Sequence, residues 1–360
     1  MSQIIVVGGG LIGLLSAMEL RDRGHEVTLL ERGETGRESS WAGGGILSPI
    51  YPWRYPPEVN RLALWSSSYY PVLVKRVMEA TGENPELYHS GLLVLDPEQL
   101  EPGEAWAREY DQPCQRLSAA QLRELEPNLN WPVEQALLFP HIGQVRNPFL
   151  TKAMRAFLDT LGVQVVTDTE VTDFDVQNGQ VQALLAGTRR FTADAYVMAT
   201  GAWSGQLMQK LGLALPIEPV KGQMLLYRIE PGQLGRIVLY QGKYIIPRQD
   251  GHVLVGSTME HSGFDKQLTE VAAKELSEYA TGLLPALNPH SLVKQWAGLR
   301  PGSPSGIPMI GAVPGLENIY LNAGHFRNGV CMGPATAMQL ADIISKKPTQ
   351  FAEIDYKLPI

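Results

Sequence analysis

The sequence predicts a two-domain protein of the α/β (α+β) class, and three observations lead to that prediction. Apolar strands alternate with helices in the first 31 residues and again between residues 149 and 211. Short strands joined by polar turns follow between residues 220 and 256, a pattern typical of an antiparallel sheet. A chain of 360 residues is long enough for two domains. We therefore expect a Rossmann-type nucleotide-binding domain and a second domain built on a large antiparallel sheet.

The first 31 residues carry a complete dinucleotide-binding fingerprint. Residues 4–7 form an apolar, β-branched run, and residues 8–13 follow at once and match G-x-G-x-x-G. A helix over 14–20 and a second strand over 27–30 then lead to Glu31. A strand, glycine turn, helix, strand and acid in this order, within about 30 residues, predict dinucleotide binding.

Each part of this fingerprint has a physical role. Gly8 permits the tight turn, Gly10 lets a pyrophosphate approach the backbone, and Gly13 lets the helix pack closely on the strands. The helix N-terminus offers free N–H groups to the pyrophosphate. Glu31 can accept hydrogen bonds from ribose hydroxyls, which favours a free 2′-hydroxyl over a 2′-phosphate. These residues alone fit FAD and NAD equally.

Composition narrows the class of protein. The net charge of −7 gives no reason to expect a nucleic-acid partner. Cys114 and Cys331 are the two cysteines, which imply no disulfide framework and fit a reducing cytoplasm. The N-terminus lacks a basic region and cleavage site, so no signal peptide is expected. No apolar run approaches the ~20 residues of a membrane span, and no metal site is expected.

The segment after the fingerprint predicts a loop that faces the cofactor. Residues 37–49 combine hydroxyl side chains, three consecutive glycines and apolar residues, which a purely solvated loop would not need. The aromatic cluster of Tyr51, Trp53 and Tyr55 is interpreted as packing. A helix is expected over 62–78.

The alternation of strands and helices is interrupted in the middle of the chain and then resumes. A strand is expected over 88–96, and the charged, proline-containing stretch 97–127 is interpreted as an insertion with a helical patch over 119–125. The remaining expectations are a helix over 149–161, strands over 163–166 and 170–174, hairpin strands over 180–185 and 191–192, and a strand that enters a Thr-Gly turn at 195–204 before a helix over 205–211.

The last third of the chain predicts the second domain and a return to the first. Strands are expected over 220–229, 237–240, 244–247 and 253–256, with a covering helix over 269–284. The further expectations are a crossing strand over 295–302, strands over 307–311 and 319–323, a turn over 324–330, and a helix over 332–345.

Several motifs together resemble a known family over essentially the whole chain. They lie at 8–13 with Glu31, 36–46, 199–204, 220–224, 296–304 and 324–329. The set is similar to the D-amino-acid-oxidase family of FAD-dependent oxidoreductases, and within it to the glycine oxidases of the thiamine pathway.

The resemblance implies FAD as the cofactor and oxidative deamination of glycine as the activity. The products would be glyoxylate, ammonia and hydrogen peroxide, with molecular oxygen as acceptor, and the intermediate imine would supply thiamine thiazole synthesis. Sarcosine and small D-amino acids would also react. The implied FAD-binding domain comprises residues 1–80, 141–215 and 297–360. The substrate domain comprises 81–140 and 216–296, and a homo-oligomer is expected.

The resemblance also implies the residues that handle the substrate. A substrate carboxylate in a desolvated pocket needs a paired charge, and a guanidinium provides two parallel hydrogen bonds. Arg300 matches the family arginine that binds this carboxylate, Tyr244 matches its hydrogen-bonding partner, and Arg327 matches an arginine near substrate and flavin. Met259 matches an apolar residue that bounds the pocket. Structural roles stay open as alternatives. Arg300 could form an inter-domain salt bridge, and Arg327 could form an ion pair. Tyr244 could be an ordinary sheet tyrosine, and Met259 a core methionine.

The implied FAD-binding residues come from seven segments of the chain. They are Gly8, Gly10, Leu11, Ile12, Gly13, Glu31, Arg32, Ser39, Ser40, Ala42, Gly43, Gly44, Gly45, Ile46, Leu47, Val171, Thr200, Gly201, Trp203, Arg300, His325, Phe326, Arg327, Asn328, Gly329 and Val330. The sequence assigns no role to Arg54, Arg146 or Arg248.

No general base stands out in the sequence. The family reaction is hydride transfer from a neutral amine, which makes His325 a structural residue or a backbone contributor. The helix that opens near 328–330 can direct its N-terminal dipole at the flavin. Cys331 raises the question of a covalent flavin, but glycine oxidases bind FAD non-covalently. A D-amino-acid dehydrogenase, another amine oxidase of the family, and a non-catalytic flavoprotein remain as alternatives.

Overall fold

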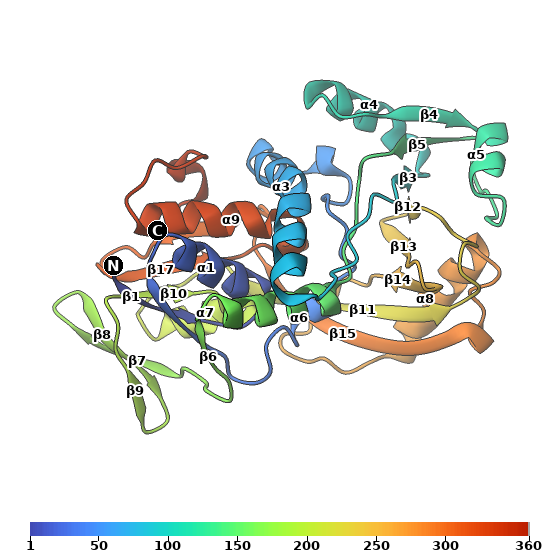
Figure 1. Ribbon diagram of the computed structural model, residues 1–360. Helices are drawn as coiled ribbons and strands as arrows, with labels where there is room; N and C mark the ends of the chain where they lie inside the picture. The colour runs from blue at the N-terminus through green and yellow to red at the C-terminus, as the bar shows by residue number, and fades with distance from the viewer. Residues whose placement is uncertain (359–360) are drawn as a thin grey trace.

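The computed structural model describes residues 1–358 and contains two large sheets that lie next to one another (Figure 1). The smaller sheet has six strands in the order β16-β17-β10-β1-β2-β6, and β16 runs antiparallel to its parallel neighbours. Its strands are β16 (Met309–Ala312), β17 (Ile319–Ala323), β10 (Ala195–Met198), β1 (Gln3–Val7), β2 (Glu26–Leu30) and β6 (Gln164–Val166).

The six-stranded sheet is buried on both faces, which explains why β1 is apolar at every interior position. Ile4 and Val6 pack with helices on one face, whereas Ile5 and Val7 pack on the other face against a small sheet and α7. The helices are α1 (Leu11–Asp22), α3 (Pro57–Thr81), α6 (Asn147–Thr160) and α9 (Gly329–Ile344). The opposite layer is β7 (Asp173–Gln177), β8 (Gln180–Ala186), β9 (Arg189–Phe191) and α7 (Ser204–Gln209).

The larger sheet has eight strands in the order β15-β11-β14-β13-β12-β3-β5-β4. The pair β12–β3 is parallel and the other pairs are antiparallel. Its strands are β15 (Leu292–Gly302), β11 (Glu218–Arg228), β14 (His252–Gly256), β13 (Lys243–Pro247), β12 (Ile237–Tyr240), β3 (Leu92–Val94), β5 (Gln135–Phe139) and β4 (Gln115–Ser118).

The two faces of the larger sheet have different neighbours. On one face, α8 (Glu270–Leu283) packs against Leu225 and Val255. On the other face, Met224 and Tyr244 belong to a cluster that continues toward the smaller sheet. The shorter elements are α2 (Ser39–Ala42), α4 (Leu100–Glu109), α5 (Ala119–Leu125), and the 3₁₀ turns η1 (Pro52–Arg54), η2 (Pro97–Gln99), η3 (Gly201–Trp203), η4 (Pro289–Ser291) and η5 (Glu353–Tyr356).

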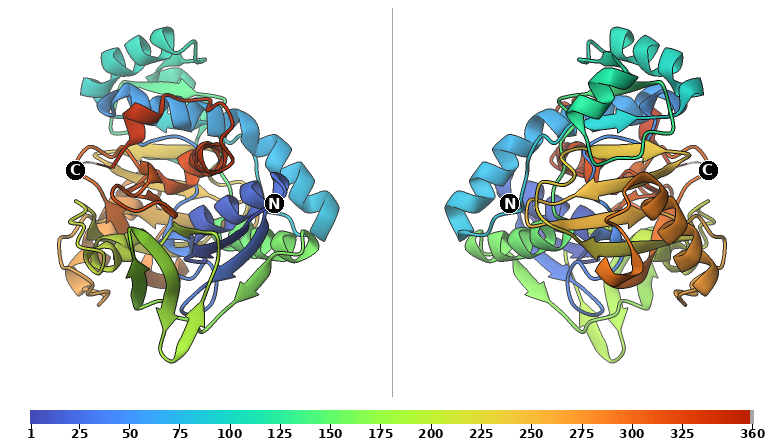
Figure 2. Two further views of the ribbon diagram at one scale, coloured as in Figure 1. Left: turned by 90° about the vertical axis from the view of Figure 1, so that its left-hand side faces the viewer. Right: turned by 90° about the vertical axis from the view of Figure 1, so that its right-hand side faces the viewer.

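The predicted two-sheet α/β fold is confirmed, and most predicted elements occur within a few residues of their expected positions. The stretch 97–127 differs most, because α4, β4 and α5 extend the larger sheet (Figure 2, teal). The predicted strand 88–96 shortens to β3, since Tyr88 forms only an isolated bridge with Gln144. The predicted strand 170–174 begins later, at Asp173, because residues 169–172 line a cavity instead.

Candidate cofactor and substrate site

One large cavity, of about 530 Å³, lies between the two sheets. Its walls come from both sheets and from the loops that leave the carboxyl ends of β1, β10 and β17. Most predicted site residues line it, which brings together side chains about 300 positions apart in the sequence. They are Gly8, Gly10, Leu11, Ile12, Glu31, Arg32, Ser39, Ser40, Ala42, Gly43, Gly44, Gly45, Ile46, Val171, Thr200, Gly201, Trp203, Tyr244, Arg300, His325, Phe326, Arg327, Asn328, Gly329 and Val330.

Three of the predicted residues do not line the cavity. Gly13 is buried within the first turn of α1, and Leu47 is buried in the core beside α1. Met259 lies on the loop after β14, where it is 56% exposed. The structure therefore gives Met259 no contact with this cavity, because its loop carries the side chain outward.

The glycine turn has the geometry that its sequence predicts. Gly8 has φ +108°, and its N–H donates to Leu30 at 2.8 Å. A Cβ at Gly13 would overlap the Gly8 carbonyl oxygen, which explains the close packing of helix on strand. The Glu31 carboxylate accepts from the N–H of Gly9 at 2.6 Å and of Gly33 at 3.0 Å. Glu31 thereby fixes the turn while one face of it borders the cavity.

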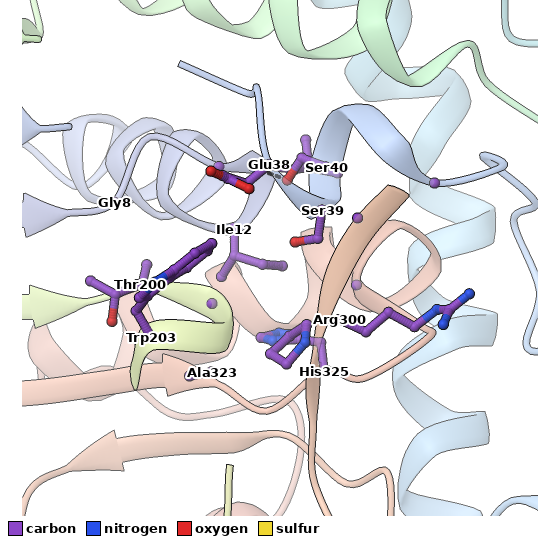
Figure 3. Close-up of a pocket in the computed structure, with 18 of the residues that line it drawn as sticks. Gly8, Ile12, Glu38, Ser39, Ser40, Thr200, Trp203, Arg300, Ala323 and His325 are labelled. Atoms are coloured by element: carbon purple, nitrogen blue, oxygen red, sulfur yellow. Dashed lines mark hydrogen bonds between the residues drawn. The ribbon is translucent and has the colours of Figure 1, made fainter. Parts of the chain in front are cut away.

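A group of interacting side chains surrounds one end of the cavity (Figure 3). Trp203 follows the Thr-Gly turn, where Gly201 has φ +56°. The Arg32 guanidinium lies 3.7 Å from the Trp203 ring centre, and Phe264 packs on the same ring at 5.5 Å. Glu38 pairs with Arg32 at 2.8 Å and with Lys266 at 3.0 Å. This end offers a flat aromatic surface next to the helix N-terminus of the fingerprint.

Arg300 lies toward the other end of the cavity, within β15 rather than after it (Figure 3). Its Nη1 donates to the carbonyl oxygens of Lys221 at 3.3 Å and Thr258 at 3.2 Å, and its Nη2 donates to Ser257 Oγ at 2.7 Å. A guanidinium has five N–H groups. One on Nε and one on Nη2 therefore have no acceptor among residues 1–358, which leaves a pair of donors for a carboxylate.

The positive charge of Arg300 has no carboxylate partner among residues 1–358. No carboxylate within residues 1–358 forms an ion pair with Arg300 or Arg327. Burial lowers the pKa of Arg300, and the neighbouring Arg327 cation lowers it further. Two half-buried cations that face one cavity without an acid favour an anionic ligand. Tyr244 borders the same space, and its hydroxyl donates to Met224 Sδ at 3.3 Å.

The helix α9 begins at the cavity, and its first residues are mostly buried. His325 Nε2 lies 3.0 Å from Thr336 Oγ1, and burial lowers the pKa of His325 to about 3. The imidazole is therefore neutral at physiological pH and does not provide a strong base. Cys331 is 2% exposed, its Sγ donates to the Asn328 carbonyl at 3.3 Å, and it does not line the cavity.

Two buried amides have free polar atoms in this cavity. Asn322 Oδ1 and Asn328 Nδ2 have no hydrogen-bond partner among the described residues, although the side chains are 1% and 2% exposed. Buried polar atoms are normally paired. A ligand with hydroxyl and carbonyl groups, such as the ribityl chain and ring of a flavin, would supply the missing partners. The residues present therefore fit FAD.

Sequence reasoning missed part of this site. Asn322 had a weak signal, a polar residue near the carboxyl end of an apolar strand, where ligands bind in α/β sheets. Gly222 and Met224 belong to a motif that was recognised but not placed at the cavity. Glu38 and Ser48 lie within the loop that was predicted to face the cofactor, although they were not named individually. Other lining residues have no local signal in the sequence; they include Ile50, Thr169, Glu170, Thr172, Gln206 and Lys210.

The fold and site define an FAD-binding oxidoreductase whose cofactor cavity is also lined by two arginines, Arg300 and Arg327. The family model for FAD-dependent oxidoreductases (DAO) matches residues 3–343. The chain belongs to this family, and its cofactor is FAD. No helix within residues 1–358 is long and apolar enough to cross a membrane.

The most informative relatives are glycine oxidases. The chain is 45% identical to the glycine oxidase of Pseudomonas aeruginosa over 344 residues, covering 95% of this chain and 94% of that protein. It is 31% identical to the bifunctional protein ThiO/ThiG of Trichormus variabilis, of which it covers 52%. The crystal structure of glycine oxidase from Geobacillus kaustophilus matches with a TM-score of 0.93 at 29% identity, covering 100% of this chain and 99% of that one. The predicted family resemblance is thus confirmed.

Proposed function

We propose that the protein oxidises glycine with FAD and oxygen. The balanced reaction is glycine, oxygen and water to glyoxylate, ammonia and hydrogen peroxide through an imine. The observation that supports this most strongly is the position of Arg300. Three hydrogen bonds hold its guanidinium in place, and two of its N–H groups remain for a carboxylate. The glycine oxidases among the relatives support the same substrate.

The residues around Arg300 mainly bind and orient the substrate. Arg300 and Tyr244 would hold the carboxylate, and Arg327 adds a second cation to the same space. Bound FAD supplies the acceptor for the hydride that leaves the α-carbon. The neutral His325 agrees with a substrate that arrives as the free amine, because such a substrate needs no base from the protein.

The size of the substrate is limited by apolar neighbours. Ile46, Ile50 and Met224 line the cavity near Tyr244. A substrate with a hydrogen or a methyl group on its nitrogen or α-carbon would fit such surroundings best. Sarcosine and small D-amino acids therefore belong to the proposed substrate range, while bulky amino acids do not.

Several further points belong to the proposal. The FAD-binding domain comprises residues 1–80, 141–215 and 297–360, and the substrate domain comprises 81–140 and 216–296. The strands of the two sheets support this division, although the boundary at 297 falls within β15.

FAD is held non-covalently, which the position of Cys331 outside the cavity supports. The imine supplies thiamine thiazole synthesis in the cytoplasm, a role supported by the ThiO/ThiG relatives. A homo-oligomeric state stays a prediction.

Product analysis tests the proposed reaction. Purified FAD-loaded protein is incubated with glycine, sarcosine, D-alanine or D-proline, and peroxide, ammonia and the oxo acid are measured together with oxygen consumption. We expect equal amounts of glyoxylate and peroxide from glycine. Absence of peroxide from glycine would refute the proposal. Turnover only with an artificial electron acceptor would replace oxygen with another acceptor and favour a dehydrogenase.

A further inference from the structure

A buried arginine lies behind the cofactor-facing loop, on the side away from the cavity. Arg248 is 4% exposed, and it does not line the cavity. Its Nη2 donates to the Gly44 carbonyl at 2.8 Å, and its Nη1 donates to Gln144 Oε1 at 2.6 Å and to the Val145 carbonyl at 3.0 Å. The side chain therefore connects the loop to the segment before α6.

The positive charge of Arg248 has no carboxylate partner within residues 1–358. The nearby acids Glu86 and Asp250 pair instead with Arg146, at 3.2 and 2.8 Å. Burial lowers the pKa of Arg248 to about 10, so the group is still a cation at physiological pH. Burying a cation without an acidic partner costs folding free energy. We therefore expect the charge of Arg248 to have a function.

The hydrogen bonds of Gln144 fix the orientation of its amide toward Arg248. Its Nε2 donates to the hydroxyl of Tyr88 at 2.8 Å and to Ser90 Oγ at 3.0 Å. The amide oxygen is therefore the atom that faces Arg248, and it accepts at 2.6 Å. Because Gln144 is itself fully buried, this arrangement holds the guanidinium in one position.

The geometry of the loop backbone connects Arg248 to the cavity. The Gly44 carbonyl points to Arg248, and the Gly45 carbonyl accepts from the N–H of Val145 at 2.9 Å. In a trans peptide the N–H points opposite to the carbonyl. The N–H groups of Gly45 and Ile46 therefore point to the other side of the loop, where both residues line the cavity.

This part of the loop lies at the catalytic end of the cavity. A Cβ built on Gly44 would lie 3.3 Å from Tyr244 Cε2. Gly45 has φ +79°, and a Cβ there would be 2.6 Å from Asn147 Oδ1, so a larger residue cannot replace it without moving the loop. The two inward N–H groups are thus held beside the residues that surround the proposed substrate.

We propose that Arg248 is a positioning residue that holds the Gly45 and Ile46 N–H groups toward the flavin ring and favours the negatively charged, reduced flavin. The proposal rests on the proposed function, because that function places the ring beside Tyr244. Fixed N–H dipoles and a buried cation stabilise developing negative charge without reorganisation. Arg248 acts directly on the Gly44–Gly45 peptide and, through its hydrogen bond to Val145, on the Gly45–Ile46 peptide, and it does not touch the substrate.

The reduction potential of the bound flavin provides the test. Arg248→Met removes the cation and the hydrogen bonds, whereas Arg248→Lys keeps the charge but cannot reach Gln144, Val145 and Gly44 at once. Arg228→Met is the matched control, because Arg228 is exposed at the end of β11. The potential is measured by dye equilibration and the FAD dissociation constant by fluorescence, both without substrate.

The expected result is selective loss of affinity for reduced FAD. Arg248→Met should weaken binding of reduced relative to oxidised FAD by at least tenfold, which lowers the two-electron potential by about 30 mV. Arg248→Lys should give a smaller shift and Arg228→Met none. An unchanged potential in Arg248→Met overturns the proposal. If Arg248→Met does not retain FAD, Arg248→Lys decides. A wild-type potential and a wild-type FAD affinity in Arg248→Lys overturn the proposal, and a lowered potential in Arg248→Lys supports it. The reduction potential and the FAD dissociation constant are measured without substrate, so neither depends on whether glycine is the substrate.

Discussion

Gly222 determines where the Arg300 guanidinium can lie. A Cβ at Gly222 would overlap the Nη1, Nη2 and Cζ atoms of Arg300, so the guanidinium lies flat across the bare backbone of β11. The neighbouring Lys221 and Gln223 point to the other face of the strand, where Lys221 Nζ pairs with Glu260. The motif at 220–224 thus combines a space for one cation with an anchor for another.

Gly222→Ala should weaken substrate binding without loss of the cofactor. The added methyl group displaces the guanidinium from its three acceptors, and we expect the KM for glycine to rise about tenfold or more. Steady-state kinetics and the flavin absorbance per protein measure the two effects. Gly282→Ala is the control, because no atom lies within 4 Å of a Cβ there. An unchanged KM would show that Arg300 does not need this space.

His325 should make the folded protein less stable in acid. Its pKa is about 3 in the folded state because of burial, against about 6.5 in an unfolded chain. Between these values the unfolded state binds a proton that the folded state rejects, so stability falls as the pH falls. When the pH is lowered from 6.5 to 4.5, the free energy of unfolding of His325→Gln should fall by about 2 kcal/mol less than that of the wild type. Urea unfolding measures this difference, with exposed His290→Gln as control; equal losses in wild type and His325→Gln would contradict the prediction.

The loop between β14 and α8 supports Arg300 from behind. Ser257 and Thr258 supply two of its three acceptors. The Glu260 carboxylate accepts from Gln223 Nε2 at 2.9 Å, from Thr258 Oγ1 at 2.5 Å and from Lys221 Nζ at 3.0 Å. Although burial opposes it, these hydrogen bonds lower the pKa of Glu260. The loop is therefore fixed to β11 by one carboxylate.

Glu260→Gln tests this connection. The change removes the closest carboxylate of Lys221, which is 2% exposed; its Nζ keeps the Gln267 carbonyl at 3.1 Å, and the next carboxylate, Asp265, is 4.0 Å away. We expect a KM for glycine about tenfold higher, with FAD still bound, because the acceptors of Arg300 shift. Glu278→Gln, which removes an exposed pair with Lys274 on α8, is the control. Kinetics identical to wild type would mean that the loop does not position Arg300.

Elements that depend on local pattern could be predicted from the sequence, and elements that depend on distant partners could not. The turn at 8–13 and the strands of 220–256 have local periodicity and glycines that specify their conformation. By contrast, β3 pairs with β12 across a long stretch of chain, and β4 joins the sheet only through β5, which pairs with β3. The segment 97–127 therefore resembles an insertion in the sequence, although in the structure it completes a sheet.

At the scale of the whole molecule, the site is an assembly of both sheets. Fingerprint residues such as Gly8 and Glu31 could be predicted because their conformation is set within about 30 residues. Asn322 and Lys210 reach the cavity only because β17 pairs with β10, the neighbour of β1, and α7 packs on the same sheet. Met259 shows the opposite case, since the family resemblance implies a place at the pocket while its loop directs the side chain to solvent.

Anaerobic titration of the flavin with glycine tests the central claim most directly. Under nitrogen, glycine should bleach the oxidised flavin of the wild-type protein completely, because the hydride has no other acceptor. Arg300→Ala should retain FAD but need about two orders of magnitude more glycine for the same bleaching, since the substrate carboxylate loses its cationic partner. An oxidised spectrum that glycine leaves unchanged, or equal glycine requirements in the two proteins, would contradict the proposed function.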